Sequence, residues 1–438
     1  MNKNVYIPLF VFSLCISAAQ GVYAQFTLSA EIRPRAEYRD GFKRPLEHGA
    51  DPAFFVEQRT RLNTAFSSER IEVFISFQDV RNWGSTTQVY KSDPSLQNIY
   101  AAWAAYKVDP KHSISMGRME LDYDNARILG NLDWAAQARS HDLLKYEYKS
   151  EKIRLHAGAA FNQDYATPEP VKLSGTYYGV LNNYKTMQFA WLHRDWDNSG
   201  LSVLLLNNGA AGTKVVNGIT LADSSINFSQ TLGFFGTKII GGASLEYDAY
   251  YQLGKNPSGQ DLNAYMAGAN ITFWKSKPTN LSLGVEYLTG DKTSTTDKDE
   301  NFNPLYGTHH KFYGFMDYFY VGNAHQNKGL INGFVKSKFK TGAKSSMLAH
   351  VHEFLSESRI TNGENREMSS RLGTEVDLVY VLNAAPGVVL NVGYSQMFFT
   401  KSLESIKGVS DPRSNAAWAW AMISFKPILF TTKTASTQ

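Results

Sequence analysis

Apolar and polar residues alternate without interruption from Phe26 to Arg39. Even-numbered positions are apolar and odd-numbered positions are polar over this whole segment. A period of two places successive side chains on opposite faces of a β-strand, so that one face contacts an apolar medium and the other contacts water. A tilted strand of about 9–11 residues crosses a bilayer. The segment therefore predicts a membrane-spanning strand whose even residues, such as Leu28, face lipid and whose odd residues face a lumen. Pro34, which has no N–H to donate, predicts a bulge or a strand end.

The same alternation recurs along the chain as far as its C-terminal region. It predicts about 18 antiparallel strands, among them one at residues 312–321 and a last one at residues 416–425. A barrel of about 16–18 strands is wide enough for an aqueous channel. Two longer polar segments, residues 82–98 and 162–183, predict external loops. The predicted fold is therefore all-β, an antiparallel transmembrane β-barrel with a polar, water-filled lumen.

The N-terminal segment has the pattern of a secretory signal peptide. A lysine at position 3 precedes an apolar run, and Ala24 stands before Gln25, which predicts cleavage near Ala24. We therefore expect a signal peptide at residues 1–24, a barrel at 25–427 and a polar tail at 428–438. The one cysteine, Cys15, lies inside the signal, which excludes a disulfide scaffold. No later segment reaches the roughly 18 uncharged apolar residues that a spanning helix requires.

A charge-dense stretch, residues 116–142, interrupts the strand pattern. Lipid cannot accommodate its charged side chains, and a protein core can do so only where they are paired. We expect them to contact water or a polymer of opposite charge. If the stretch folds inward, it forms a constriction. The eight charged residues are Arg118, Glu120, Asp122, Asp124, Arg127, Asp133, Arg139 and Asp142.

Two motifs resemble the alginate-export family of outer-membrane β-barrels. The second motif follows the first by about 170 residues, in the order that the family has. The first consists of Gly117, Arg118, Leu121, Tyr123, Arg127, Gly130, Asp133 and Trp134, and the second of Gly290, Asp291, Phe302, Asn303, Pro304, Leu305, Tyr306, His310, Lys311, Tyr313, Gly314 and Asp317. The resemblance implies an outer-membrane barrel and a cargo of alginate or a related polyuronate.

Charged residues on the inward faces define a predicted lumen path. On the first two strands five arginines stand against three acids, and two interpretations remain open. The arginines either form a ladder of bidentate pairs with the acids, which stiffens the wall, or form a basic track for an anionic polymer. The charge-dense stretch has the same ambiguity, because its acids suffice to pair its arginines. The predicted path residues are Glu31, Arg33, Arg35, Glu57, Arg59, Arg61, Arg118, Asp122, Asp124, Arg127, Asp133, Arg139, Arg154 and Asp317.

The sequence predicts no catalytic, cofactor or metal site. His350 and His352 share one strand face, but Glu353, the neighbouring third donor, points to the other face, which favours two lumen-facing histidines. Residues 297–308 begin like a calcium-binding EF-hand loop but lack the glycine at position six and the glutamate at position twelve. No hydrolase, zinc-protease or phosphate-loop motif occurs.

Together these features predict a porin of the Gram-negative outer membrane that passively conducts a polar, anionic carbohydrate. The alternatives are a general or small-solute porin without polymer specificity, a barrel that acts only as an adhesin or anchor, and a secreted β-rich polysaccharide-active enzyme. The expected partners are outer-membrane lipid, an anionic polysaccharide or oligosaccharide, and periplasmic export or uptake components. A net charge of +4, mixed with acids, gives no support for nucleic-acid binding.

Overall fold

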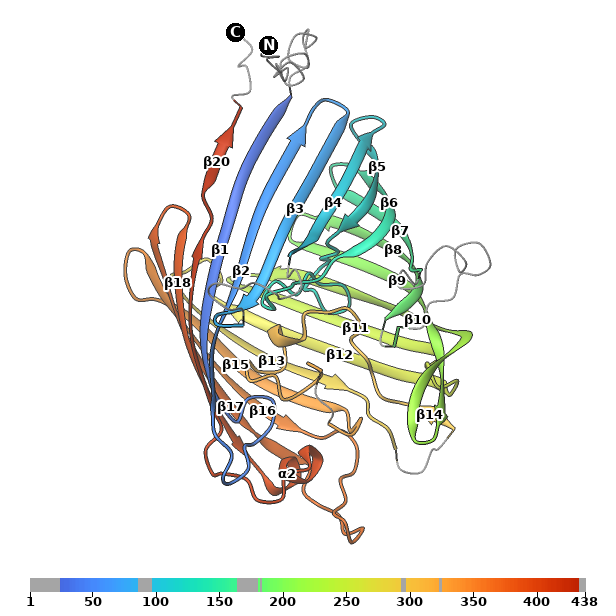
Figure 1. The fold of residues 1–438 in the computed structure, drawn as a ribbon, viewed down its shortest axis with the longest axis vertical. Coiled ribbons are helices and arrows are strands. Elements are labelled where there is room, and N and C mark those ends of the chain that lie inside the picture. The colour runs from blue at the N-terminus through green and yellow to red at the C-terminus, as the bar shows by residue number, and fades with distance from the viewer. Residues whose placement is uncertain are drawn as a thin grey trace, which may run out of the picture.

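The alternating segments form the wall of a closed barrel in the computed structural model (Figure 1). The structure describes residues 24–85, 97–163, 180–181, 183–292, 297–322 and 325–432. Within these residues the wall has 18 antiparallel strands, numbered β1–β13 and β15–β19. Two short strands, β14 and β20, are added to it. The signal-peptide prediction and most of the two predicted external loops lie outside the described residues.

The wall strands follow one another around the barrel in chain order. Each is antiparallel to the next, and β19 pairs with β1 to close the ring. Their bounds are β1 Gln25–Asp40, β2 Ala53–Ser67, β3 Ile71–Asn82, β4 Gln97–Lys107, β5 His112–Met119, β6 His141–Lys149, β7 Ile153–Phe161, β8 Tyr184–Trp196, β9 Ser199–Val216, β10 Ile219–Ile240, β11 Ala243–Lys255, β12 Asp261–Phe273, β13 Thr279–Leu288, β15 Leu330–Lys340, β16 Ser345–Leu355, β17 Arg371–Ala385, β18 Val388–Phe399 and β19 Ala417–Phe425.

The first strand has the two faces that its sequence predicts. The Glu31 and Arg33 side chains point inward and each residue is 6 % exposed, whereas Ile32 between them is 44 % exposed on the outer face. Pro34 does not end the strand or shift its register. Its ladder with β2 is continuous, and on the other side the pairs with β19 resume in the same register at Arg35 after omitting positions 33 and 34. The missing N–H therefore removes bonds to β19 without a bulge.

Large apolar side chains cover the outer face of the wall. Such residues come from strands all around the ring, as expected for a surface in contact with lipid. Examples are Ile32, Phe77, Leu144, Leu205, Val285 and Phe398. Among the described residues, no helix is both long and apolar enough to span a membrane.

The two ends of the barrel differ in the length of their connections. At one end the strands are joined by turns of two to five residues, and the described chain begins and ends there (Figure 1). Outer-membrane barrels place such short turns on the periplasmic side. At the opposite end most of the connections are longer, except those from β9 to β10 and from β11 to β12, and one of the long ones carries α2, the helix Lys401–Lys407.

Two of the long connections fold into the lumen (Figure 1). Inner loop 1, residues 120–140, joins β5 to β6, and inner loop 2, residues 297–322, belongs to the connection from β13 to β15. Inner loop 2 includes β14 (Lys298–Asp299), which pairs with β12, and the single 3₁₀ turn η1 (His309–Lys311). Apolar side chains of both loops, including Leu129 and Met316, are buried there.

The predicted strand at residues 312–321 is wrong. The segment forms turns inside the lumen, and Phe312, Tyr313, Tyr318 and Phe319 are all buried although they have both parities. A segment that is enclosed on every side needs no polar face. Its many aromatic residues therefore reflect burial inside the lumen, although the same residues are also common in strands. Left-handed backbone at Gly314, Asp317 and Tyr320 prevents an extended conformation.

The C-terminal segment contributes one more strand than predicted. Ile428–Thr431, placed by the sequence analysis within a polar tail, forms β20 and pairs with the start of β1. Its first three residues are apolar and exposed, and Phe430 pairs with Leu28 and contacts the Phe26 ring on the outer face of β1.

Candidate functional site

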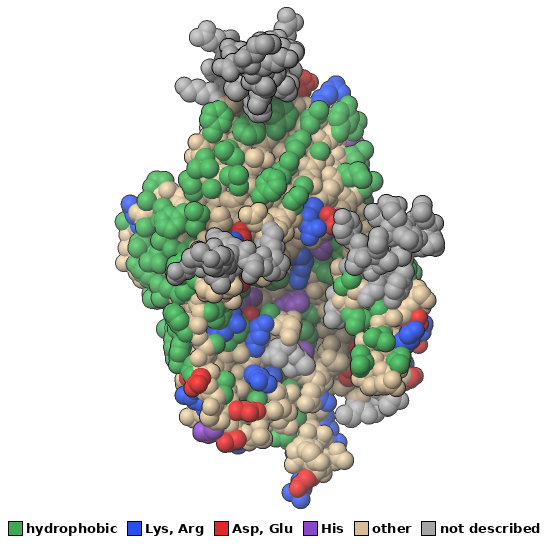
Figure 2. Space-filling model, viewed as in Figure 1, with side chains coloured by type: hydrophobic (Ala, Val, Ile, Leu, Met, Phe, Trp, Pro, Cys, Tyr) green, Lys and Arg blue, Asp and Glu red, His purple; other side chains and the backbone are tan. Residues whose placement is uncertain are grey.

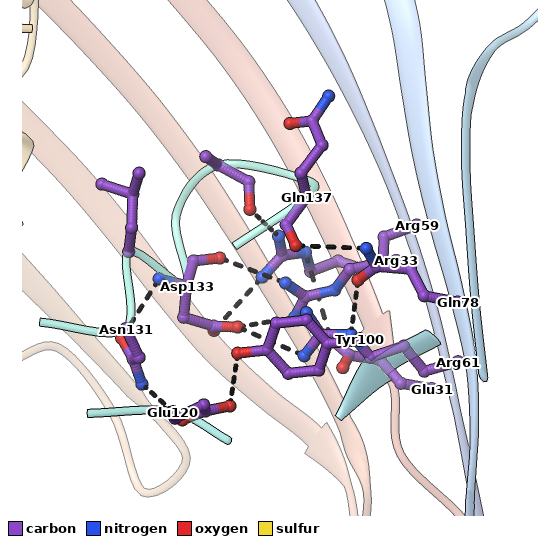
Figure 3. A network of polar contacts seen from close by, with 12 residues as sticks. Glu31, Arg33, Arg59, Arg61, Gln78, Tyr100, Glu120, Asn131, Asp133 and Gln137 are labelled. Atoms are coloured by element: carbon purple, nitrogen blue, oxygen red, sulfur yellow. Dashed lines mark hydrogen bonds and ion pairs between the residues drawn. The ribbon is translucent and has the colours of Figure 1, made fainter. Parts of the chain in front are cut away.

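An arginine cluster on β1 and β2 binds the tip of inner loop 1 (Figure 3). Arg59 donates to Glu31 at 2.7 Å and to Asp133 at 2.7 Å. Arg33 donates to the other oxygen of Asp133 at 3.3 Å. Arg61 stacks 3.5 Å over the ring of Tyr100 and lies 3.9 Å from Asp133. One loop carboxylate is therefore surrounded by three guanidinium groups.

The register of β1 and β2 explains why the loop carboxylate is needed. Arg33 lies directly opposite Arg59, while Glu31 faces Arg61 and Arg35 faces Glu57. Like charges directly opposite one another on a sheet are destabilising unless an anion lies between them. Asp133 supplies this anion from inner loop 1. Burial raises the pKa of the Asp133 carboxyl, but Arg59 and Arg33 lower it more, and the pKa falls below its usual range.

The next residue of the loop is held by the same strands. Arg35 donates to the carbonyl oxygen of Trp134 at 2.7 Å and stacks over its ring at 4.3 Å. It also pairs with Glu37 and Glu57, each at 2.8 Å. The ring of Trp134 stacks on His310 of inner loop 2 at 4.7 Å. The Asp133-Trp134 pair thus docks inner loop 1 to the wall and to the other loop.

Five arginines meet four carboxylates in this cluster. The ladder interpretation accounts for the wall acids, and inner loop 1 adds a carboxylate that the strands alone do not provide. One positive charge remains in excess, which leaves the track interpretation compatible with the same geometry. The arginines are Arg33, Arg35, Arg39, Arg59 and Arg61, and the carboxylates are Glu31, Glu37, Glu57 and Asp133.

Arg127 anchors inner loop 1 to the opposite side of the lumen. It is 3 % exposed, donates to Asp248 on β11 at 3.1 Å and forms a short ion pair with Glu286 on β13. Tyr313 of inner loop 2 accepts a third bond from it at 3.1 Å. Burial alone lowers the pKa of Arg127, but Glu286 and Asp248 outweigh burial and raise it well above its usual range. This arginine is charged and fully paired within the described residues.

The two sequence motifs meet inside the barrel. Residues Leu129 and Tyr306 form a parallel bridge, and the N–H of Gly130 donates to the Tyr306 carbonyl at 2.9 Å. Arg139 donates to the carbonyls of Tyr306 and of Gly307, the latter at 3.0 Å. A Cβ on Gly307 would lie 2.0 Å from the Arg127 carbonyl oxygen, so only glycine allows the two backbones to approach this closely.

The other predicted path residues have separate environments. Asp124 accepts from Trp191 at 2.9 Å and from Ser202 at 2.5 Å, and burial raises its pKa. Asp317 bonds to His310 at 2.6 Å inside inner loop 2. Asp122 is exposed on inner loop 1, and partial burial of its carboxyl raises its pKa.

Arg154 and Arg118 are not part of the arginine cluster and pair with other carboxylates. Arg154 on β7 pairs with Asp195 at 3.1 Å and lines a lumen cavity. Arg118 has the parity of the exposed residues Ile114 and Met116 on β5, so it lies on the outer face, where it pairs with Asp142 at 3.1 Å. Its assignment to the lumen is corrected: near the rim, this pair meets water or headgroups.

Among the described residues, two cavities lie between the inner loops and the short turns. The larger, about 970 Å³, is lined by charged side chains of both signs, among them Lys145, Glu147 and Arg154. The smaller, about 350 Å³, lies against Arg127 and His350. Figure 2 shows Lys, Arg and His side chains gathered in the middle of the face that it presents, between hydrophobic side chains of the outer wall.

Sequence reasoning did not identify the wall partners of the inner loops. Asp248 and Glu286 bind Arg127, and Tyr100 and Gln78 contact Arg61. Asp248, Glu286 and Gln78 stand at inward positions of alternating strands, which is the signal that could have marked them as lumen-facing, whereas Tyr100 lies at a bulge of β4 where the alternation breaks. Asp248 and Glu286 lie more than a hundred residues from Arg127 in the sequence. Their pairing with it follows from tertiary structure alone.

Comparison with solved structures finds other barrels of similar shape. OpdQ of Pseudomonas aeruginosa is 13 % identical with a TM-score of 0.57, and 92 % of this chain covers 98 % of that one. OccK9 (OpdG) of the same organism is 11 % identical with a TM-score of 0.58 over the same shares. Its outer membrane protein OpdK is 9 % identical with a TM-score of 0.57, covering 93 % of this chain and 99 % of that one. At these identities the likeness establishes the fold alone.

Comparison of sequences gives the family. No curated protein matches the chain significantly. The sequence profile of the family described as alginate export matches residues 24–416, which include both motifs and both inner loops. The chain, an outer-membrane transport barrel rather than an enzyme, therefore belongs to the alginate export family.

Proposed function

We propose that this outer-membrane channel passively conducts a polar, anionic saccharide of the polyuronate type, and that inner loop 1 lies in the solute path. The observation that carries the proposal is the convergence of Arg33, Arg59 and Arg61 on the Asp133 carboxylate, whose side chain is 47 % exposed. Asp133 is presented from a loop, not from the wall. A carboxylate of a passing uronate has the same charge and shape and can compete for the same donors.

The charge balance suits transport better than tight binding. Guanidinium groups offer fixed forks that match carboxylates, and the excess of one positive charge in the cluster attracts anions. Asp133 and Glu31 already occupy part of this donor set. A solute carboxylate therefore gains little net free energy on binding, and it can leave again, as conduction requires.

Ion selectivity in planar bilayers tests this proposal. Replacing Arg33, Arg59 and Arg61 by Gln should lower the anion-to-cation permeability ratio toward one, because fixed positive charge is removed from a narrow aqueous passage. Replacing Asp133 by Asn should have the opposite sign and raise the ratio. Recordings at low ionic strength are the most sensitive, since the Debye length is about 10 Å at 0.1 M salt and longer below it.

The matched control is Arg118→Gln, which removes one arginine from the outer face. Heat-modifiable mobility on gels must show that each variant is folded. A cation-selective wild-type channel, unaffected by millimolar oligouronate, would exclude the anionic cargo. A wild-type barrel that passes no current at all would indicate an adhesin or anchor.

A second candidate is a small-solute channel without polymer specificity. The observation in its favour is the filling of the lumen, where two anchored loops leave cavities of about 970 and 350 Å³. Such volumes suit single small molecules. Liposome swelling separates the two functions, because a small-solute channel admits neutral monosaccharides and uronates at similar rates and is not blocked by oligouronates.

A further inference from the structure

A buried cluster on the inner face of β16 and β17 has the donor set of a metal site. His350 and His352 lie on β16, Asp377 lies on β17, and one ligand atom of each falls within 4.8 Å of the others. In the strand register His350 is directly opposite Asp377, and His352 is opposite Glu375. Strand alternation places all four side chains on one face. We propose that His350, His352 and Asp377 bind one divalent first-row transition metal ion such as Zn²⁺.

The hydrogen bonds of Asn332 fix the His352 ring in a ligating state. The Asn332 amide nitrogen donates to Glu286 at 2.9 Å and to the Phe312 carbonyl at 3.2 Å, both of which can only accept. Its oxygen therefore faces His352 Nδ1 at 3.0 Å, and that nitrogen must carry the proton. The Nε2 lone pair is left for another partner. Metal-bound histidines are commonly oriented by such a bond on the other ring nitrogen.

Two other candidate metal-ligand atoms, Asp377 Oδ2 and His350 Nδ1, have no N–H or hydroxyl partner among the described residues. Ser395 donates to Asp377 Oδ1 at 2.5 Å and orients the carboxylate. Asp377 Oδ2 accepts from no described N–H or hydroxyl group, although the residue is only 1 % exposed, and the neighbouring Glu375 carboxyl can share a proton with this side chain. His350 Nδ1 is also buried and unpartnered. Leaving buried polar atoms unsatisfied is costly, and a bound cation would satisfy the carboxylate and an imidazole lone pair at once.

The surrounding charges leave room for a cation. Glu375 is fully buried next to the cluster, and one of its oxygens accepts from the N–H of Met316 at 2.8 Å. Its other oxygen accepts from no described N–H or hydroxyl group, and its carboxyl shares a hydrogen bond with the Asp377 side chain. Lys336, opposite His350 in the register, is the cation that opposes binding. With neutral histidines, the Asp377 carboxylate offsets Lys336, and a bound divalent ion would displace the proton that Glu375 shares with Asp377, so that the second carboxylate offsets part of the charge of the ion.

The donor set indicates the class of metal. Two imidazoles and one carboxylate suit Zn²⁺ and similar first-row ions, whereas Ca²⁺ and Mg²⁺ prefer oxygen ligands alone. Three protein ligands leave at least one coordination position open. Because His350 lines the cavity of about 350 Å³, that position faces the lumen. Glu353, the neighbouring donor in the sequence, points outward and pairs with Arg371 at 2.6 Å, so that the third ligand is supplied instead by Asp377 of β17.

Metal binding to the detergent-solubilised full barrel, prepared without a histidine tag and treated with chelator, tests the proposal. Zn²⁺ titration against a chromophoric chelator should give one tight site per chain. His352→Gln and Asp377→Asn should each abolish it, and Asn332→Ala should weaken affinity by about 10–100-fold through loss of ring orientation. His156→Gln, a histidine on β7 lining the larger cavity, is the matched control and should bind like wild type.

Cobalt gives a readout that does not depend on the variants. Co²⁺ bound in a low-symmetry histidine and carboxylate site should show visible absorption bands that one equivalent of Zn²⁺ displaces. Wild-type protein without such bands and without a stoichiometric Zn²⁺ site would overturn the proposal. So would folded His352→Gln and Asp377→Asn variants that bind Zn²⁺ as tightly as the His156→Gln control.

Discussion

Arg127 illustrates how single residues hold the lumen together. Its side chain is almost completely buried, and its two carboxylate partners belong to strands far along the chain. A buried ion pair often contributes no more to the free energy of unfolding than a well-packed apolar pair would. Removal of one partner, however, leaves the other charges buried and uncompensated. The charged residues Arg127 and Asp133 of this stretch therefore hold inner loop 1 to the wall through ion pairs.

Replacing Arg127 by Met should therefore destabilise the barrel. The side-chain volume is nearly kept, while Asp248 and Glu286 lose their common partner, and the expected loss is about 3–5 kcal/mol of unfolding free energy. Urea unfolding in liposomes, followed by heat-modifiable gel mobility, measures it. Arg118→Gln, at an exposed pair, should change stability by less than about 1 kcal/mol. Equal midpoints for the two variants would contradict this role of Arg127.

At the scale of elements, inner loop 1 is docked by a titratable group. The pKa of Asp133 is lower in the folded barrel than in the unfolded chain, so its ion pairs stabilise the docked loop above the unfolded pKa, near 4, and are lost as pH falls through the folded value. The unfolded state binds more protons in that window, and docking weakens with acid.

Single-channel recordings from pH 6 down to pH 3 should therefore show larger or noisier openings at the acid end. Asp133→Asn should show this behaviour already at pH 6 and respond less to acid, which separates Asp133 from other carboxylates that titrate nearby. Asp142→Asn, on the outer face, is the control. If wild type and Asp133→Asn have the same pH dependence, Asp133 does not hold the loop.

Strands could be predicted from the sequence because each repeats a local pattern that the membrane and the lumen impose on it. Glu31 and Ile32 lie on the expected faces for this reason. The inner loops could be located but not described. Residues 312–321 are packed on all sides, so their apolar and polar residues do not alternate. The contact of Arg127 with Glu286 depends on which strands become neighbours in the barrel. The same holds for Asp377, whose register with His350 is set across a long connection.

At the scale of the whole molecule, stability depends on closure between the first and last strands. Trp418 is fully buried on β19, and its Nε1 donates to Glu37 on β1 at 2.9 Å. An unclosed edge would expose unpaired N–H and C=O groups to lipid, which costs several kcal/mol for each group. Closure is thus a condition for insertion and not only an addition to stability.

Truncation before Trp418 should abolish assembly of the barrel in the outer membrane. Membrane fractionation and heat-modifiable mobility check this outcome. Deletion of residues 433–438, which keeps every described strand, is the control and should leave assembly intact. A folded, inserted barrel from the shorter chain would mean that another pairing can close the ring.

The bridge between Leu129 and Tyr306 has a mechanical consequence. Two flaps hinged on opposite walls would open independently, and recordings would contain two classes of partial opening. Loops that share backbone hydrogen bonds move instead as one body with attachments at both sides of the lumen. A solute that pulls Asp133 from its arginines would then also load the contacts of Arg127 and Tyr313, and the channel would pass between closed and open in a single step.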